Sequence, residues 1–311
     1  MEIKKRTEVL ERLSEVLSLN NIFTDESLSR HTSFKIGGPC DFFVIAEDET
    51  ELTDTIDICD ELNVKYLLLG NGTNVLVSDE GFSGVVIKLM GKFSEITIEE
   101  KINDGEALIT AGAGVLLSKL SMFSLKKGFS GLEFAGGIPG SVGGAVYMNA
   151  GAYGHSVSDV IKSVVTLRED GKIKEYTCEE AKFSYRKSVF ADNNEIILFA
   201  RFLVKVYPRI PIRVVMERYR AERAEKQPLE LPSAGSFFKR PEGNFAGKLI
   251  EEAGLKGYRT GDAGVSEKHA GFIVNYGNAT FDDVIKVMQH VIDTVYDKFK
   301  VKLEPEVKII K

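Results

Sequence analysis

Cysteine is scarce in this sequence. The 311 residues include three, Cys40, Cys59 and Cys178, which are widely spaced and form no CxxC pair. An odd number of isolated cysteines does not make a disulfide framework, and none stands near a histidine pair that would complete a metal site. We therefore expect three reduced thiols that act as small core residues, and no metal.

Long apolar runs are also missing. No stretch approaches the ~20 apolar residues of a membrane-spanning helix, and residues 1–17 are charged and amphipathic, without the apolar centre of a signal peptide. Positive charge is not in excess, because 40 Lys and Arg stand against 46 Asp and Glu, a net charge of −6. Such a chain has no general attraction to nucleic acid or anionic membranes. We expect a cytoplasmic protein without either partner.

The chain is long enough for two or three domains, because single hydrophobic cores stop growing near ~250–300 residues. Hydrophobic residues make up 43% of it, as in an ordinary folded protein. The pattern predicts an α+β protein with a first domain at 1–89 that includes an N-terminal helix, a strand-rich second domain at 90–206 and a third at 207–311. Helices are expected over 4–19, 49–62, 116–127, 213–227, 245–253 and 281–299, strands over 41–46, 66–69, 271–277 and 303–310, and a linker over 207–211.

The segment 131–154 is the richest in glycine. Eight of its residues are glycine, and Glu133 is its single charged residue. Glycine lets the backbone turn with positive φ and approach a ligand closely. Plain tight turns would show the same composition, but here small apolar residues alternate with the glycines and Asn149 adds a polar amide. The segment favours a cofactor-binding loop with these contacts: Gly136, Gly137, Ile138, Gly140, Ser141, Gly143, Gly144, Asn149 and Gly151.

A second glycine turn follows an apolar strand at 70–74. It is not a dinucleotide-fold fingerprint, because Val75 stands where that motif needs a third glycine, and strand and turn residues continue where a helix should begin. No GxxxxGK[ST] sequence occurs either. The turn suits an anion nest for a pyrophosphate, formed by Gly70, Asn71, Gly72, Thr73 and Asn74. Two such segments fit FAD laid across a domain junction.

At this point a family resemblance becomes specific. Seven segments, in family order and spread over almost the whole chain, resemble the UDP-N-acetylenolpyruvoylglucosamine reductases. They are RHTSFKIGGPCDFFV (30–44), LGNGTNVLV (69–77), SGLEFAGGIPGSVGGAVYMNAGAYG (130–154), FSYRKSVF (183–190), GSFFKRP (235–241), GDAGVSEKHAGFIVN (261–275) and EPEV (304–307). The resemblance implies a two-lobed FAD-binding fold of the vanillyl-alcohol-oxidase type with a C-terminal α+β substrate domain.

The resemblance also implies a reaction. NADPH passes hydride to noncovalently bound FAD, and the hydride then reaches the β-carbon of UDP-N-acetylglucosamine enolpyruvate to give UDP-N-acetylmuramate, a peptidoglycan precursor. The substrate carboxylate must accept electron density, so donors and positive charge must face it. The resemblance implies that Arg186 binds that carboxylate through two N–H groups of its guanidinium. It also implies that Glu306, with a raised pKa, is a protonated partner of the same carboxylate, and that Ser236 donates a proton to the α-carbon.

Without the resemblance, each of these residues has an ordinary explanation. Arg186 would be a surface arginine at a strand corner, Glu306 a solvent-side residue of a terminal strand and Ser236 a turn serine that caps backbone. Most of the charged residues between 213 and 226 read as a solvated helix face with glutamate partners. Lys226 is assigned to the substrate diphosphate by its position before Gln227 and Pro228.

The remaining assignments concern the substrate and the subclass. Tyr185 and Lys239 are assigned to substrate, with Lys239 a candidate relay for Ser236. The four histidines show no metal or relay spacing. Only 50 residues separate Arg186 from Ser236, which leaves no room for the tyrosine loop of the longer class. The chain therefore resembles the shorter class, and a monomer is expected.

Two competing functions stay open at this level. One is a flavin oxidase of the same fold, although an oxidase needs neither the serine nor the acid of GSFFKRP and EPEV. The other is a flavin- or nucleotide-binding module without catalysis.

Overall fold

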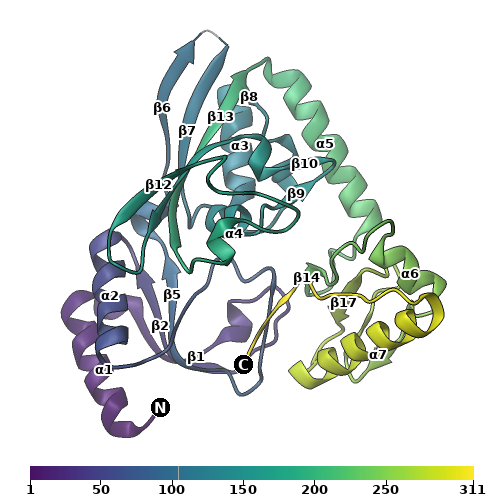
Figure 1. Ribbon diagram of the computed structural model, residues 1–311, viewed down its shortest axis with the longest axis horizontal. Helices are drawn as coiled ribbons and strands as arrows, with labels where there is room; N and C mark the ends of the chain where they lie inside the picture. Colours follow the sequence, from purple (N-terminus) through teal and green to yellow (C-terminus); the bar gives the residue numbers. More distant parts are fainter. Residues whose placement is uncertain (104) are drawn as a thin grey trace. The chain divides into compact units, whose positions relative to one another are not determined.

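The computed structural model describes residues 1–103 and 105–311 (Figure 1). The chain forms two compact units. Unit 1 comprises Met1–Phe23, Phe42–Asn71 and Gly84–Glu222, and unit 2 comprises Thr24–Asp41, Gly72–Ser83 and Arg223–Lys311. Within the described residues, no helix has the length and apolar character needed to cross a membrane. The division into three domains at residues 89 and 206 stays a prediction.

Two helices pack together at the start of unit 1. They are α1 (Ile3–Val16) and α2 (Glu49–Glu61). The apolar spacing of α1 buries Val9 and Leu13. Asp48 begins α2, because its carboxylate accepts hydrogen bonds from the N–H groups of Thr50 and Glu51. Both predicted helices are present, although α1 ends at Val16 and not at residue 19.

A four-stranded sheet has the strand order β1–β2–β5–β3. Its members are β1 (Ile22–Ser27), β2 (Pro39–Ala46), β3 (Tyr66–Leu68) and β5 (Phe82–Leu89). The predicted strand–helix–strand order β2–α2–β3 is confirmed. The two strands are not neighbours, however, because β5 lies between them and pairs in parallel with β3.

The larger sheet of unit 1 is antiparallel and has the order β12–β11–β13–β7–β6, with β8 also on β13 (Figure 1). Its central strand β13 alternates buried Leu198, Ala200 and Phe202 with less buried residues, so one face turns to the core. The strands are β6 (Ile96–Asn103), β7 (Glu106–Gly112), β8 (Phe129–Ser130), β11 (Ile161–Leu167), β12 (Ile173–Thr177) and β13 (Ile196–Val206).

The glycine-rich segment differs from the expected loop. It contains the helix α4 (Val142–Tyr147), which Ser141 caps by accepting from the N–H of Gly144. Small side chains let this helix pack closely, and Val142, Ala145 and Val146 are buried. Before it lies α3 (Leu117–Lys127), ended by Gly128 with a φ of +75°. The short elements nearby are η3 (Gly91–Ser94), η4 (Glu133–Gly137), β9 (Gly151–Ala152), β10 (His155–Ser156), η5 (Val157–Asp159) and η6 (Val189–Ala191).

The helix α5 (Arg209–Lys226) begins within the segment 207–211 that the sequence predicts as a linker. The linker prediction is wrong from Arg209 onward, because the helix already begins there. The sequence suggested a linker because of Pro211, but this proline stands in the first helical turn. The N–H that proline lacks has no helical partner there, so proline is tolerated. The helix ends before Pro228, as predicted.

Unit 2 has a sheet of order β14–β17–β16–β15 and the helices α6 and α7 (Figure 1). Thr280 and Asp283 form a capping box at the start of α7, as expected for a helix beginning at Phe281. The elements of unit 2 are η2 (Leu28–Arg30), β4 (Val75–Val77), β14 (Ser233–Ser236), α6 (Ala246–Glu252), β15 (Arg259–Thr260), β16 (Ala263–Val265), β17 (Phe272–Asn275), α7 (Phe281–Phe299) and β18 (Lys308–Ile310). Unit 1 also contains the short helix η1 (Leu19–Asn21).

The last strand is shorter than predicted. β18 pairs in parallel with β4 over Lys308–Ile310 only. Residues 303–307 do not form the regular strand expected from their alternating pattern. Pro305 makes a single bridge to Phe238 instead, and as a proline it has no N–H to extend a ladder.

Candidate active site

The turn at Gly70 lies against the glycine-rich segment within unit 1. Asn71 donates a hydrogen bond of 2.6 Å from Nδ2 to the carbonyl of Pro139. A Cβ at Gly70 would lie 2.6 Å from the Oγ of Ser141, which is closer than real Cβ atoms come. The structure therefore brings two of the predicted cofactor contacts together, and a side chain at position 70 would require Ser141 Oγ to shift.

Replacing Gly70 with alanine is expected to destabilise the protein by about 1–3 kcal/mol, because the added methyl group overpacks a close contact. We also expect less flavin in the purified variant, because Ser141 begins the glycine-lined helix α4. Thermal unfolding and the ratio of flavin to protein absorbance measure the two effects.

The control removes the atom with which the methyl group collides. Gly70→Ala combined with Ser141→Ala should be more stable than Gly70→Ala alone, although Ser141→Ala by itself loses a helix cap worth ~1 kcal/mol. A double variant no more stable than the single one would show that the contact with Ser141 is not the cause.

The other predicted contacts in the glycine-rich segment have different surroundings. Gly143 is buried, and a Cβ there would lie 2.9 Å from the Cβ of Ala113. At Gly136 a Cβ would lie 3.1 Å from Cε of Met216. Gly144 is exposed, whereas Gly137, Ile138, Gly140 and Gly151 are half-buried. The segment thus combines glycines that permit close backbone packing with glycines that face outward.

Asn149 is buried, and its amide is engaged within the protein. Its Nδ2 donates to the carbonyl of Ser184 at 3.0 Å, and its Oδ1 accepts from the N–H of Ser158 at 3.0 Å. The backbone at Asn149 has a φ of +42°, a conformation that asparagine adopts more readily than most residues. Its contact with a cofactor stays a prediction, whereas its hold on the segment around Ser184 is a direct structural role.

Arg186 lies at the tip of a tight turn between Ser184 and Lys187, which exchange backbone hydrogen bonds of 2.9 and 3.2 Å. Its φ is +55°, a left-handed conformation that is costly for a side-chain-bearing residue. The guanidinium donates to the carbonyls of Asn149 at 3.5 Å and Gly151 at 3.2 Å. The arginine is therefore oriented by the glycine-rich segment.

Other residues support the glycine-rich segment and the turn that carries Arg186, and the sequence did not predict a functional role for them. Ser188 is buried and donates to the carbonyl of Tyr147 at 2.8 Å. Tyr153 stacks on Tyr219 with ring centroids 3.9 Å apart and donates to its carbonyl at 2.7 Å. Nothing in the sequence pattern marks these supports, since they depend on contacts between distant segments. Tyr185, the predicted substrate contact, is 55% exposed and has the Arg186 guanidinium 5.2 Å from its ring centroid.

In unit 2, the turn continues through Gly72, Thr73 and Asn74. Gly72 is buried with a φ of +61°, and a Cβ there would lie 2.0 Å from the carbonyl oxygen of His31. Over the residues that the structure describes, the N–H groups of Gly72, Thr73 and Asn74 donate to no protein acceptor. Successive N–H groups without protein acceptors can donate to a bound anion, and a buried one requires a partner. These residues therefore fit a phosphate-bearing cofactor.

The segments that carry Ser236 and Glu306 are joined within unit 2 by a backbone hydrogen bond at Phe237. The N–H of Glu306 donates to the carbonyl of Phe237 at 2.8 Å, and Asn74 Nδ2 donates to the carbonyl of Glu306 at 3.3 Å. Ser236 is exposed, whereas Phe237 and Phe238 are buried and pack in the core of unit 2. Gly235, with a φ of +77°, permits the register shift between Ser233 and Ser236.

The two lysines assigned to substrate have separate positions. The Lys239 ammonium pairs with Glu304 at 3.1 Å rather than with Ser236, so the structure gives no support to Lys239 as a relay for the serine. Lys226 is the last residue of α5 and is exposed. That Arg186 meets Ser236 and Glu306 around one substrate stays a prediction.

The three cysteines are free thiols. Burial raises the pKa of the Cys40 and Cys59 thiols to about 12 and also raises the pKa of Cys178. High pKa values make thiols unreactive. Among the described residues, no group of three or more His, Cys, Asp or Glu side chains could hold a metal ion.

Comparisons with known proteins define the class first. A family model described as an FAD binding domain matches residues 40–177, which include the Gly70 turn and the whole glycine-rich segment. Together with the close backbone packing of these segments, the match identifies a flavin-binding protein. The expected α+β flavin-binding fold is confirmed.

Further matches identify the family. A second model, the C-terminal domain of UDP-N-acetylenolpyruvoylglucosamine reductase, matches residues 227–310. The reductase of that name from Agathobacter rectalis is 46% identical and covers 96% of each chain, and the one from Lachnoclostridium phytofermentans is 46% identical over 97% of each. The crystal structure of the Thermus caldophilus enzyme has a TM-score of 0.78 at 35% identity and covers 93% of this chain and 98% of that one. This chain belongs to the UDP-N-acetylenolpyruvoylglucosamine reductase family.

Proposed function

We propose that this chain reduces UDP-N-acetylglucosamine enolpyruvate to UDP-N-acetylmuramate with electrons from NADPH through FAD. The observation that carries the proposal is the match to reductases of this name over 96% of the chain at 46% identity. The local geometry supports it, because Arg186 is held by the glycine-rich segment in unit 1, and in unit 2 the segment of the exposed Ser236 is hydrogen-bonded through its backbone to the segment of Glu306. FAD-dependent reduction places the chain in peptidoglycan precursor synthesis.

The proposed cofactor contacts follow the two glycine segments. In unit 2, we assign the N–H groups of Gly72, Thr73 and Asn74 to a phosphate of FAD. In unit 1, the Gly70 turn and the segment around Ser141 are also assigned to cofactor contacts. A flavin held by these residues would supply an acceptor for the hydride of NADPH and a hydride donor for the β-carbon of the enolpyruvyl group. Binding is noncovalent.

Arg186 has the task of stabilising charge on the substrate carboxylate. An enol ether accepts hydride poorly unless its carboxylate takes up electron density, so a fixed cation there lowers the barrier. The carbonyls of Asn149 and Gly151 already orient the guanidinium. The guanidinium then needs little reorientation at the moment of reaction. We assign Glu306 to the same carboxylate as its protonated partner, and Tyr185 to the substrate beside Arg186.

Ser236 has the task of protonating the α-carbon after the β-carbon receives hydride. The serine is exposed at the end of β14, so a substrate can reach its hydroxyl. Because Lys239 is paired with Glu304, the proton is resupplied to Ser236 from solvent. Lys226 is assigned to the UDP diphosphate and Lys239 to the substrate. We also propose that the protein is a monomer and that it works in the cytoplasm, where NADPH is regenerated.

A flavin titration tests the function directly. The purified protein should be yellow, should be bleached by NADPH without oxygen and should regain its colour with one equivalent of UDP-N-acetylglucosamine enolpyruvate. UDP-N-acetylglucosamine, which lacks the enolpyruvyl group, is the matched control and should leave the bleached protein unchanged. Rapid recolouring by oxygen alone would favour an oxidase, and failure of NADPH to bleach the flavin would favour a binding module without catalysis.

A further inference from the structure

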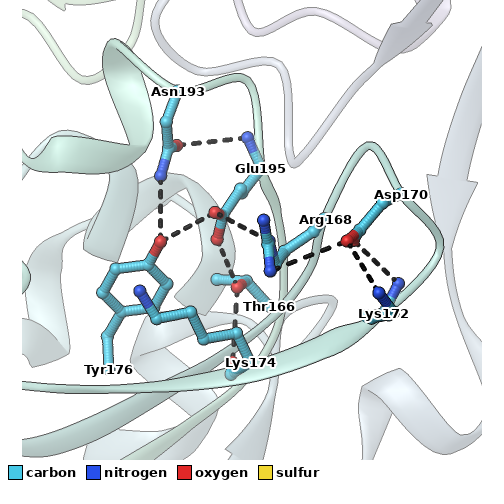
Figure 2. A network of polar contacts seen from close by, with 8 residues as sticks. All are labelled: Thr166, Arg168, Asp170, Lys172, Lys174, Tyr176, Asn193 and Glu195. Carbon is cyan, nitrogen blue, oxygen red and sulfur yellow. Dashed lines mark hydrogen bonds and ion pairs between the residues drawn. The ribbon is translucent and has the colours of Figure 1, made fainter.

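A buried carboxylate lies at the end of the segment that carries Arg186. The side chain of Glu195 is 9% exposed and stands just before β13. One of its oxygens accepts a hydrogen bond from Thr166 of β11 at 2.6 Å, and the other accepts from the hydroxyl of Tyr176 of β12 at 2.7 Å. Figure 2 shows the carboxylate between these two donors. Glu195 thus joins the chain entering β13 to two neighbouring strands.

The same carboxylate is part of a larger network (Figure 2). Asn193 donates from Nδ2 to the Tyr176 hydroxyl at 3.3 Å and accepts from the N–H of Glu195 at 3.2 Å. The Nε of Arg168 lies 3.9 Å from Glu195. A buried carboxylate is costly unless it is hydrogen-bonded and paired, and here each carboxylate oxygen has a donor. Such networks fix their members in one arrangement.

The network fixes both ends of the segment 178–195, which connects β12 to β13. Tyr176 stands in β12 before the segment, and Glu195 ends it. In between, Phe190 packs edge-on against the Tyr176 ring with centroids 5.2 Å apart. The N–H of Val189 donates to the carbonyl of Ala181 at 2.9 Å and closes the segment into a loop around the Arg186 turn. The arginine is therefore carried by a loop whose two ends meet at the Glu195 carboxylate.

We propose that Glu195 is a positioning residue for Arg186. By accepting from Thr166 and Tyr176, its carboxylate sets the spacing of the two ends of the loop and thereby the place of the left-handed turn that presents the guanidinium. The assignment rests on the proposed function, in which Arg186 faces the substrate carboxylate. Rigid support of this kind matters because a small displacement of a catalytic group lowers the rate strongly.

Glu195→Ala tests the proposal by separating the two half-reactions. Reduction of the flavin by NADPH should stay within about twofold of the wild-type rate, whereas reoxidation by UDP-N-acetylglucosamine enolpyruvate should slow by roughly 10- to 100-fold, as misplacement of a catalytic group does. In the same variant, the amides of Lys187 and Val189 should exchange with deuterium about tenfold faster, because their acceptors belong to the loosened loop. Glu195→Gln should restore most of both readouts, because its amide can accept from Tyr176 and donate to Thr166.

A matched control lies on the same sheet. Glu175 of β12 is 52% exposed and pairs with Arg201, so Glu175→Ala removes a surface carboxylate without touching the loop and should change neither readout.

If Glu195→Ala does not fold, Tyr176→Phe removes one donor while it keeps the ring that packs on Phe190. Unaltered reoxidation together with unaltered exchange, or a Glu195→Gln variant as impaired as Glu195→Ala, would overturn the proposal. A wild-type protein that is not reoxidised by the enolpyruvate would instead refute the function, and amide exchange would still decide whether Glu195 holds the loop.

Discussion

Arg186→Lys is expected to slow the reoxidation of the NADPH-bleached protein by UDP-N-acetylglucosamine enolpyruvate by about 10²–10³-fold, the usual cost of losing one donor to a developing negative charge. Lysine keeps the charge but not the planar fork that can bind a carboxylate while its other N–H groups are engaged. In the structure, the guanidinium is held by the carbonyls of Asn149 and Gly151. Stopped-flow absorbance of the flavin measures the rate.

The neighbouring lysine gives the control for this variant. Lys187 pairs with Asp192 at 2.9 Å on the surface, so Lys187→Ala should leave the reoxidation rate nearly unchanged. Flavin content and the rate of bleaching by NADPH should match wild type in both variants, because neither depends on the substrate carboxylate. Equal reoxidation rates for Arg186→Lys and wild type would remove Arg186 from the substrate carboxylate.

Elements with a strong local signal were predictable from the sequence. The helix Phe281–Phe299 has the predicted bounds, because its apolar residues recur at helical spacing and a Thr280 and Asp283 capping box marks its start. The strand turn at 70–74 was predictable for a similar reason, since glycine and asparagine follow an apolar strand and no helix signal follows. Local chemistry alone decides these cases.

Elements that depend on distant contacts were not predictable. The helix α4 forms within a glycine-rich segment because Ser141 caps it and its small residues pack closely, as Gly143 does against Ala113. Glycine disfavours helix by local propensity, and the tertiary packing outweighs that preference. The same limit explains residues 303–307, where Pro305 and the pairing with Phe238 replace a regular strand.

The candidate site was predictable in its residue types but not in its supports. Family motifs in the sequence pointed to Arg186, Ser236 and Glu306, and the structure places the last two in backbone-linked segments. No sequence pattern could indicate that Lys239 pairs with Glu304 or that Glu195 joins Thr166 to Tyr176. Such pairings arise only when separate strands become neighbours.

Ser236→Ala is expected to lower the turnover of UDP-N-acetylglucosamine enolpyruvate by about 10²–10⁴-fold, the contribution of a positioned general acid. Ser236 is exposed at the end of β14 and follows Gly235, which has a φ of +77°. Because the serine takes no part in the first hydride transfer, NADPH should bleach the variant at the wild-type rate. Steady-state turnover and single-turnover bleaching measure the two steps separately.

Ser233→Ala is the matched control, because it removes a hydroxyl from the same strand, where the carbonyl of Ser233 rather than its side chain accepts from Ser33 at 2.6 Å. Its turnover should stay close to wild type. In deuterated water, the product of the wild-type enzyme should carry one deuterium at the α-carbon in a single configuration, since one face of the carbon meets the donor. Unchanged turnover in Ser236→Ala, with the same single configuration, would mean that another group delivers the proton and that the exposed serine of β14 has no catalytic role.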